Sequence, residues 1–194
     1  HGREGIIKDI DLSRTVGWFT SLFPVYLSIG NPDDLATVIK AVKEELRQIP
    51  HKGIGYGILT YLTPNSPLGP SNHPSLSFNY LGQWDNTLTS EGLFGFSRES
   101  VGRNVSELNT SLHPLDINAE VKERALHAAW TYSQNHYSQL TIEKLSHNFI
   151  NKLKQLIHHC CQNHNFGYTS SDFDLVTIDQ ATLIDEMINW GVNE

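Results

Sequence analysis

The stretch that most constrains the fold is RTVGWFTSLFPVYL, residues 14–27. It holds four aromatic side chains in a short span that Gly17 and Pro24 interrupt. Glycine weakens the interior of a helix or strand, and proline removes a backbone hydrogen-bond donor, so neither regular element suits the whole stretch. On its residues alone, the stretch predicts a hydrophobic strand with a kink at Pro24.

A helical pattern follows this stretch. Asn31 can cap a helix, Pro32 suits the first helical position, and the aspartates at 33–34 favour the positive end of a helix. Apolar residues then recur at helical spacing over residues 35–49, and Pro50 stops the pattern. These signals predict an amphipathic helix.

Three later segments alternate apolar and polar residues. Residues 75–82 predict a strand near the centre of a sheet, and residues 115–121 and 126–132 predict a β-hairpin around a polar turn. Thr141 opens a long helix whose buried stripe ends at Cys160. Strands mixed with helices predict an α/β (α+β) domain in which a mixed β-sheet is flanked by helices.

Composition excludes several classes of protein. The 194 residues suffice for one sizeable core or two small ones. The net charge is −7 and no lysine or arginine cluster occurs, so we expect no nucleic-acid partner. No apolar run is long enough to span a bilayer, so we expect no membrane partner. The only cysteines, Cys160 and Cys161, are adjacent, which predicts no disulfide framework and a reducing, cytoplasmic location.

One cluster of side chains resembles a metal site, and comprises His158, His159, Cys160, Cys161 and His164. Zinc ligands must converge on one point, whereas four consecutive residues of a helix point in different directions. We therefore expect a solvated helix end and no metal. No G-x-S-x-G nucleophile motif occurs either. The pairs Asn79 with Tyr80 and His1 with Glu4 can orient a substrate or exchange a proton, and on their own they are more often structural.

Several motifs taken together resemble those of epimerization domains in nonribosomal peptide synthetases. HGRE at residues 1–4 resembles the end of the family's EGHGRE motif, and residues 14–27 resemble its R-T-V-G-W-F-T motif. PHKGIGYG at residues 50–57 is similar to P-x-x-G-x-G-Y-G, and FNYLG at residues 78–82 to F-N-Y-L-G. SDFDL at residues 171–175 resembles the S-D-F that commonly closes such domains. The first four occur in the family's order and at plausible spacing.

The resemblance implies a chloramphenicol-acetyltransferase-like lobe, the C-terminal one of two. Residues 1–167 would form this lobe, and residues 168–194 a closing segment and inter-domain linker with a short helix over residues 180–190. The abrupt start at His1 leads us to expect a fragment of a longer chain. The family's H-H-x-x-x-D-G motif and the first glutamate of EGHGRE are not found in the sequence. The resemblance therefore implies that the principal histidine and glutamate lie outside this chain, and that the isolated fragment is inactive.

The activity implied is conversion of the Cα of a carrier-bound L-aminoacyl or peptidyl thioester to the D form, in antibiotic biosynthesis. The resemblance implies that Asn79 and Tyr80 support catalysis and that Trp18 and Thr20 bind substrate. It implies structural roles within the motif for His1, Arg3 and Glu4. Tyr80 could donate to an enolate oxygen or relay a proton. Adjacent strand residues face opposite sides of a sheet, so Asn79 and Tyr80 can share a site only if the strand ends or bulges there.

The resemblance implies no directly bound cofactor and no metal, because the substrate is carried on the 4′-phosphopantetheine of a carrier protein. The partners implied are a peptidyl carrier protein domain, the N-terminal lobe of the same domain and a downstream condensation domain. Two alternatives remain: a condensation-type acyltransferase lobe that forms peptide bonds, and a noncatalytic carrier-docking module. Condensation domains carry V-G-x-F-V-N-T where this chain has Gly17-Trp18-Phe19-Thr20, which favours epimerization.

Overall fold

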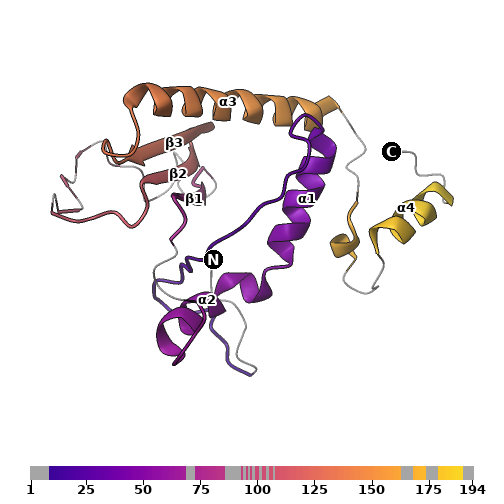
Figure 1. Cartoon of the computed structure of the whole chain (residues 1–194), viewed down its shortest axis with the longest axis horizontal. Helices are drawn as coiled ribbons and strands as arrows, with labels where there is room; N and C mark the ends of the chain where they lie inside the picture. Colours follow the sequence, from indigo (N-terminus) through magenta and orange to yellow (C-terminus); the bar gives the residue numbers. More distant parts are fainter. Residues whose placement is uncertain are drawn as a thin grey trace. The chain divides into compact units, whose positions relative to one another are not determined.

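A computed structural model describes most of the chain, namely residues 9–68, 73–85, 93, 95, 97, 99–100, 102–103, 105–106, 108–162, 168–173 and 179–189. His1, Arg3 and Glu4 lie outside the described residues. The chain divides into two compact units, one of residues 1–71 with 152–194 and one of residues 72–151. Figure 1 labels the principal helices and strands of both units.

The unit of residues 72–151 is built on a three-stranded mixed sheet in the order β1-β2-β3. Its strands are β1 (Leu76–Gln83), β2 (Leu115–Lys122) and β3 (Ala125–Tyr132). β1 pairs with β2 in parallel, and β2 pairs with β3 in antiparallel fashion, which confirms the predicted hairpin and the mixed sheet. Among the described residues β1 has a partner strand on one side only, so the structure does not bear out its predicted central position. Alternation shows that a strand has one covered face, and does not show how many neighbouring strands it has.

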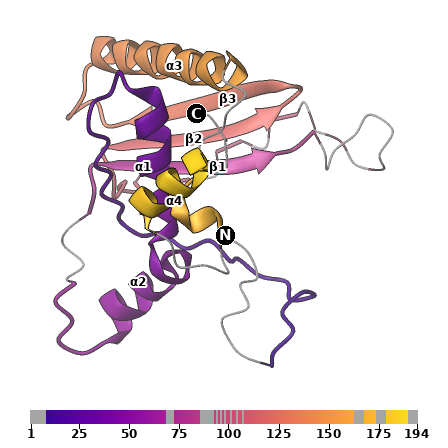
Figure 2. The same cartoon turned by 90° about the vertical axis from the view of Figure 1, so that its right-hand side faces the viewer.

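Helix α3 (Gln139–Gln162) begins in this unit and covers one face of the sheet. Leu115 and Ile117 of β2 are buried with Ile142 of α3. Trp130 of β3 and Phe149 of α3 meet edge to face, with ring centroids 5.9 Å apart. Figures 1 and 2 both show the helix running alongside β3. The helix begins two residues before Thr141, because Ser138 Oγ accepts a hydrogen bond from the backbone N–H of Thr141.

Four elements follow the stretch of residues 14–27 in the other unit. Helix α1 (Leu35–Arg47) confirms the predicted amphipathic helix. Its cap is Asp34 and not Asn31, because the Asp34 side chain accepts from the backbone N–H of Thr37 at 3.2 Å. Three short helical turns then occupy the glycine-rich region: η1 (Pro50–Gly53), α2 (Gly55–Gly57) and η2 (Ile58–Leu62). The described residues 14–27 themselves form neither a helix nor a strand, so the predicted kinked strand is wrong.

The physical reason is that a strand requires a partner strand, and this stretch is held by other contacts. The backbone N–H of Ser28, one residue beyond it, donates to both carboxylate oxygens of Glu45 on α1, at 3.0 and 3.1 Å. Two elements close the unit: η3 (Ser170–Asp172) and α4 (Gln180–Asn189), the latter confirming the predicted short helix. Among the described residues, none of the helices is long and apolar enough to cross a membrane.

Candidate functional site

Asn79 and Tyr80 lie side by side in β1 and point to opposite faces of the sheet. Asn79 is paired in register with Asn118 of β2, and Tyr80 with Ala119. The Asn79 Nδ2 donates to the Asn118 Oδ1 across a distance of 3.2 Å. Tyr80 shares the other face with Phe78, and the two side chains are 50% and 53% exposed. The polar face of the sheet thus carries the amide pair, and the apolar face carries the phenol.

The regular pairing of β1 ends directly after Tyr80. Tyr80 is opposite Ala119, but the next pair joins Gln83 to Val121, so β1 carries one more residue than β2 over this interval. Gly82 within the interval has a φ of +94°, a conformation that other residues rarely adopt. An irregularity of this kind re-aims side chains. The irregularity lies beyond Tyr80, however, and Asn79 and Tyr80 themselves stay in the regular pairing on opposite faces of the sheet, so a site shared by both stays a prediction.

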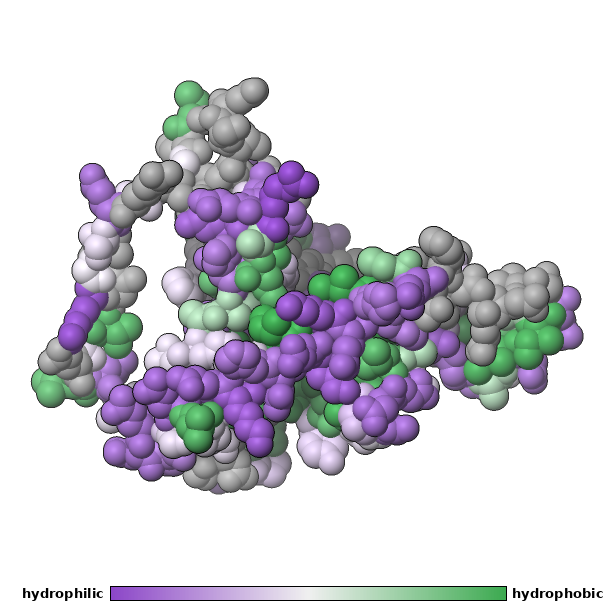
Figure 3. Space-filling view, turned by 90° about the horizontal axis from the view of Figure 1, so that it is seen from above, coloured by the Kyte–Doolittle hydropathy of each residue, from purple (hydrophilic) through white to green (hydrophobic). Residues whose placement is uncertain are grey.

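The residues expected to bind substrate, Trp18 and Thr20, belong to the other compact unit. The Trp18 side chain is 89% exposed, and Thr20 is exposed as well. A large exposed indole has most of its apolar surface available for contact with another molecule or segment. Exposed apolar residues are frequent across the chain, and hydrophobic surface is visible among hydrophilic groups in Figure 3. The binding role of Trp18 and Thr20 stays a prediction.

Two of the sequence motifs meet where Phe23 packs against Gly53. Gly53 is buried, and a Cβ atom at this position would overlap ring carbons of Phe23. The backbone is left-handed at three successive residues, with φ values of 47° at His51, 53° at Lys52 and 79° at Gly53. The glycine thus permits both the close approach of the ring and the backbone conformation. The sequence motif PHKGIGYG alone gave no sign of this contact.

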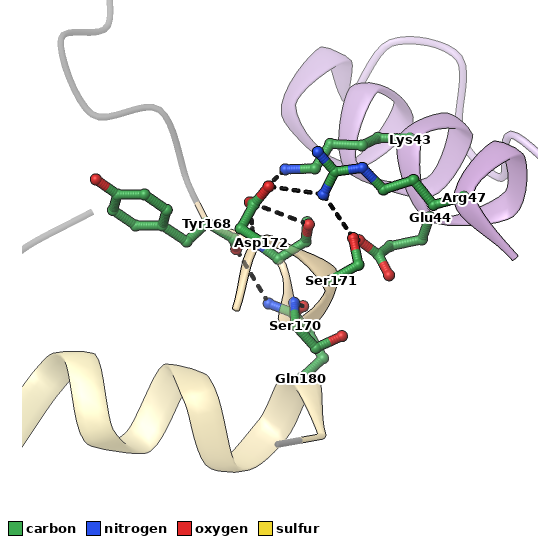
Figure 4. Close-up of polar contacts among 9 residues, drawn as sticks. Lys43, Glu44, Arg47, Tyr168, Ser170, Ser171, Asp172 and Gln180 are labelled. Atoms are coloured by element: carbon green, nitrogen blue, oxygen red, sulfur yellow. Dashed lines mark hydrogen bonds and ion pairs between the residues drawn. The ribbon is translucent and has the colours of Figure 1, made fainter. Parts of the chain in front are cut away.

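A charged cluster joins the closing segment to α1 (Figure 4). Asp172 accepts from Lys43 Nζ at 2.5 Å and from the Arg47 guanidinium at 2.7 Å. Ser171 Oγ accepts from Arg47 at 2.7 Å and donates to Glu44 at 2.5 Å. The Lys43 hydrogen bond, the Thr169 backbone N–H and Arg47 hold the pKa of Asp172 far below its usual range.

The same turn is closed internally by a capping box. Thr169, whose exposure is 1%, donates its backbone N–H to Asp172 Oδ2 at 3.0 Å. Gln180 at the start of α4 accepts from the Ser170 backbone N–H at 3.2 Å. Sequence reasoning treated this segment as the start of a linker, because it lacks a core periodicity. The available signal for a capped turn was Thr169 followed three residues later by Asp172.

The histidine-rich end of α3 lines a cavity of about 270 Å³. His158 and His159 share its wall with Lys152 and with Asp33, which precedes α1. Lys152 Nζ lies 3.4 Å from the Asp33 carboxylate. Within the part of the chain that the structure describes, no group of three or more His, Cys, Asp or Glu side chains could hold a metal ion. His164 falls outside that part.

Comparison with known proteins decides the family. The family model described as "Condensation domain" matches residues 1–174 of the chain. The chain belongs to the condensation domain family. The resemblance drawn from the motifs is thereby confirmed, and the mixed sheet with its helices agrees with the predicted fold class.

The relatives of this condensation-family chain include large synthetases. It is 39% identical over 189 residues to bacitracin synthase 2 of Bacillus licheniformis, and the match covers 97% of this chain and 7% of that protein. It is also 39% identical over 196 residues to gramicidin S synthase 1 of Brevibacillus brevis, and this match covers 95% of this chain and 18% of that protein. The chain thus spans a small fraction of the length of the relatives it matches.

Among solved structures, the chain is similar to the epimerization domain from the third module of tyrocidine synthetase B. The two share 39% sequence identity and superpose with a TM-score of 0.73. The match covers 84% of this chain and 36% of that one.

Proposed function

We propose that the chain is part of an epimerization domain of a nonribosomal peptide synthetase. The observation that carries this proposal is the likeness to the tyrocidine synthetase B epimerization domain, at 39% identity over most of the chain. The Gly17-Trp18-Phe19-Thr20 version of the central motif supports the same choice. The substrate is an L-aminoacyl or peptidyl thioester held on the 4′-phosphopantetheine of a carrier protein.

The reaction removes the Cα proton of the thioester on one face and returns a proton on the other. A thioester acidifies the neighbouring C–H, and the negative charge that develops on its oxygen requires hydrogen-bond donors. Asn79 offers amide N–H groups and Tyr80 offers a phenolic O–H from this chain. The principal base and acid belong to other parts of the longer protein, so we expect no activity from these 194 residues alone.

The proposed partners follow from this chemistry. A carrier protein domain delivers the substrate, an N-terminal lobe supplies the missing acid and base, and a downstream condensation domain takes the inverted product. No metal or directly bound cofactor has a part in the proposed reaction. Residues 168–194 remain our predicted closing segment and linker, in a protein that we expect in the cytoplasm.

The test uses the longer synthetase protein that carries this chain. A carrier protein is loaded with an L-aminoacyl pantetheine group and incubated with the synthetase in deuterated water. We expect deuterium at Cα and accumulation of the D-aminoacyl thioester. Absence of both, with carrier loading verified by mass spectrometry, would refute the proposal.

The second candidate is a condensation-type acyltransferase, which the description of the matching family model favours. It predicts a different product from the same assay when a second loaded carrier is present. A new amide bond between the two aminoacyl groups, without exchange at Cα, would establish this alternative. The noncatalytic carrier-docking module predicts neither product while retaining binding of the carrier.

A further inference from the structure

The side chain of Asn118 lies on the polar face of the sheet, where it contributes nothing to the core. β2 alternates regularly, with Leu115, Ile117 and Ala119 buried at 3%, 5% and 2% exposure, and Asn118 is exposed between the last two. The core therefore places no demand on the residue type at this position. An asparagine is also a poor strand former, so packing and propensity leave its presence unexplained.

Asn118 contacts Asn79, which lies directly opposite it in the parallel pair of strands. The Asn118 Oδ1 accepts from the Asn79 Nδ2 at 3.2 Å. The terminal torsion of an asparagine side chain has a broad, twofold distribution, so an unrestrained amide has no single orientation. Because Asn118 accepts one N–H of the Asn79 amide, that amide takes one orientation. The second N–H and the Oδ1 of Asn79 then point in defined directions.

The position of this pair along the strand adds to its importance. Tyr80, the next residue, forms the last regular pair before the register shift that ends at Gln83. Asn79 thus lies one residue before the place where the regular ladder between β1 and β2 is interrupted. A hydrogen bond between side chains holds the amide where the backbone pairing is about to be interrupted.

We propose that Asn118 is a positioning residue that orients the Asn79 amide toward the reacting thioester. This inference rests on the proposed function, and it assigns a role to a residue outside every sequence motif described above. Asn118 acts only through Asn79. Its removal therefore slows the chemical step, which depends on the orientation of a donor, and leaves carrier binding unchanged.

The experiment is a double-mutant cycle in the full synthetase protein, with Cα deuterium exchange as the readout. We expect Asn118→Leu to lower kcat about three- to tenfold with KM within about twofold, the size of effect expected from losing one orienting hydrogen bond. Asn79→Ala lowers kcat at least as much. The double variant matches Asn79→Ala within about twofold, because the partner on which Asn118 acts is gone.

Two controls separate positioning from a general loss of structure. Asp116→Asn changes another polar residue on the same face of β2, and its partner in the structure is Ser111, so we expect kcat within about twofold of wild type. Asn118→Ala repeats the test with a smaller side chain should leucine perturb folding. The side-chain amide resonances of Asn79, followed by NMR, shift in both Asn118 variants and remain in place in Asp116→Asn.

The outcomes distinguish this inference from the function on which it rests. A wild-type protein that exchanges no Cα proton overturns both. An active wild type in which Asn118→Leu and Asn79→Ala reduce kcat multiplicatively overturns the positioning role alone. Unchanged Asn79 amide resonances in the Asn118 variants overturn it as well, whatever the activity.

Discussion

Replacing Gly53 by alanine perturbs the contact between the central stretch and the glycine-rich turn. The new Cβ would be placed on ring carbons of Phe23, in a position where Gly53 is already buried. The φ of +79° at Gly53 also falls in the left-handed region that an L side chain disfavours. The substitution therefore combines a steric overlap with a backbone strain.

The two contributions can be estimated separately. A left-handed backbone costs an ordinary residue roughly 1–2 kcal/mol. Inserting a methyl group into an occupied space costs about 1–3 kcal/mol, because the ring or the backbone must shift. We expect Gly53→Ala to lower the free energy of unfolding by about 2–5 kcal/mol, which lowers the unfolding temperature by roughly 4–20 °C for a domain of this size.

Thermal unfolding of the longer protein, followed by calorimetry and by hydrogen exchange over residues 50–57, measures the effect. Gly55→Ala is the matched control, because Gly55 lies in a helical turn where an added Cβ would meet no atom within 4 Å. We expect this substitution to leave the free energy of unfolding unchanged or to raise it by up to about 1 kcal/mol. In a Phe23→Ala background, Gly53→Ala retains only its backbone cost. Equal effects of the two glycine substitutions in the wild-type background would refute the argument.

Other predictions concern the charged cluster and the hairpin. Asp172→Asn removes the charge that Lys43 and Arg47 contact, and we expect faster hydrogen exchange of the closing segment, corresponding to about 1–3 kcal/mol of local stability. The pKa of Asp172 is lowered in the folded state, so its contribution to stability is complete above the ordinary carboxyl pKa of about 4 and declines as the pH falls below that value. Acid should therefore loosen the closing segment of the wild type more than that of Asp172→Asn. Asp85→Ala removes the acceptor of the backbone N–H groups of Glu123 and Arg124, and should destabilise the β2–β3 turn by about 1–3 kcal/mol in calorimetry; an unchanged unfolding temperature would contradict this.

The local elements of this chain were predictable because their signals lie within a few residues of one another. Asn31-Pro32-Asp33-Asp34 and the apolar spacing to Ile49 predicted α1, and its cap at Asp34 forms within the same turn. Period-two alternation on both sides of a short polar turn predicted the β2–β3 hairpin. The motifs in residues 14–27, 50–57 and 78–82 indicated the family, because their order and spacing together are specific even where one of them alone is weak.

The tertiary structure alone decided which distant residues meet. Asn79 donates to Asn118, which lies 39 positions along the chain, and Lys43 donates to Asp172, which lies 129 positions along. No local sequence pattern predicts either contact. The central stretch shows the limit most clearly: its residues suggested a kinked strand, whereas the structure holds Phe23 against Gly53 without any strand pairing. Helices and hairpins satisfy their own backbone groups locally, but an isolated strand or an extended segment depends on partners that only the folded chain supplies.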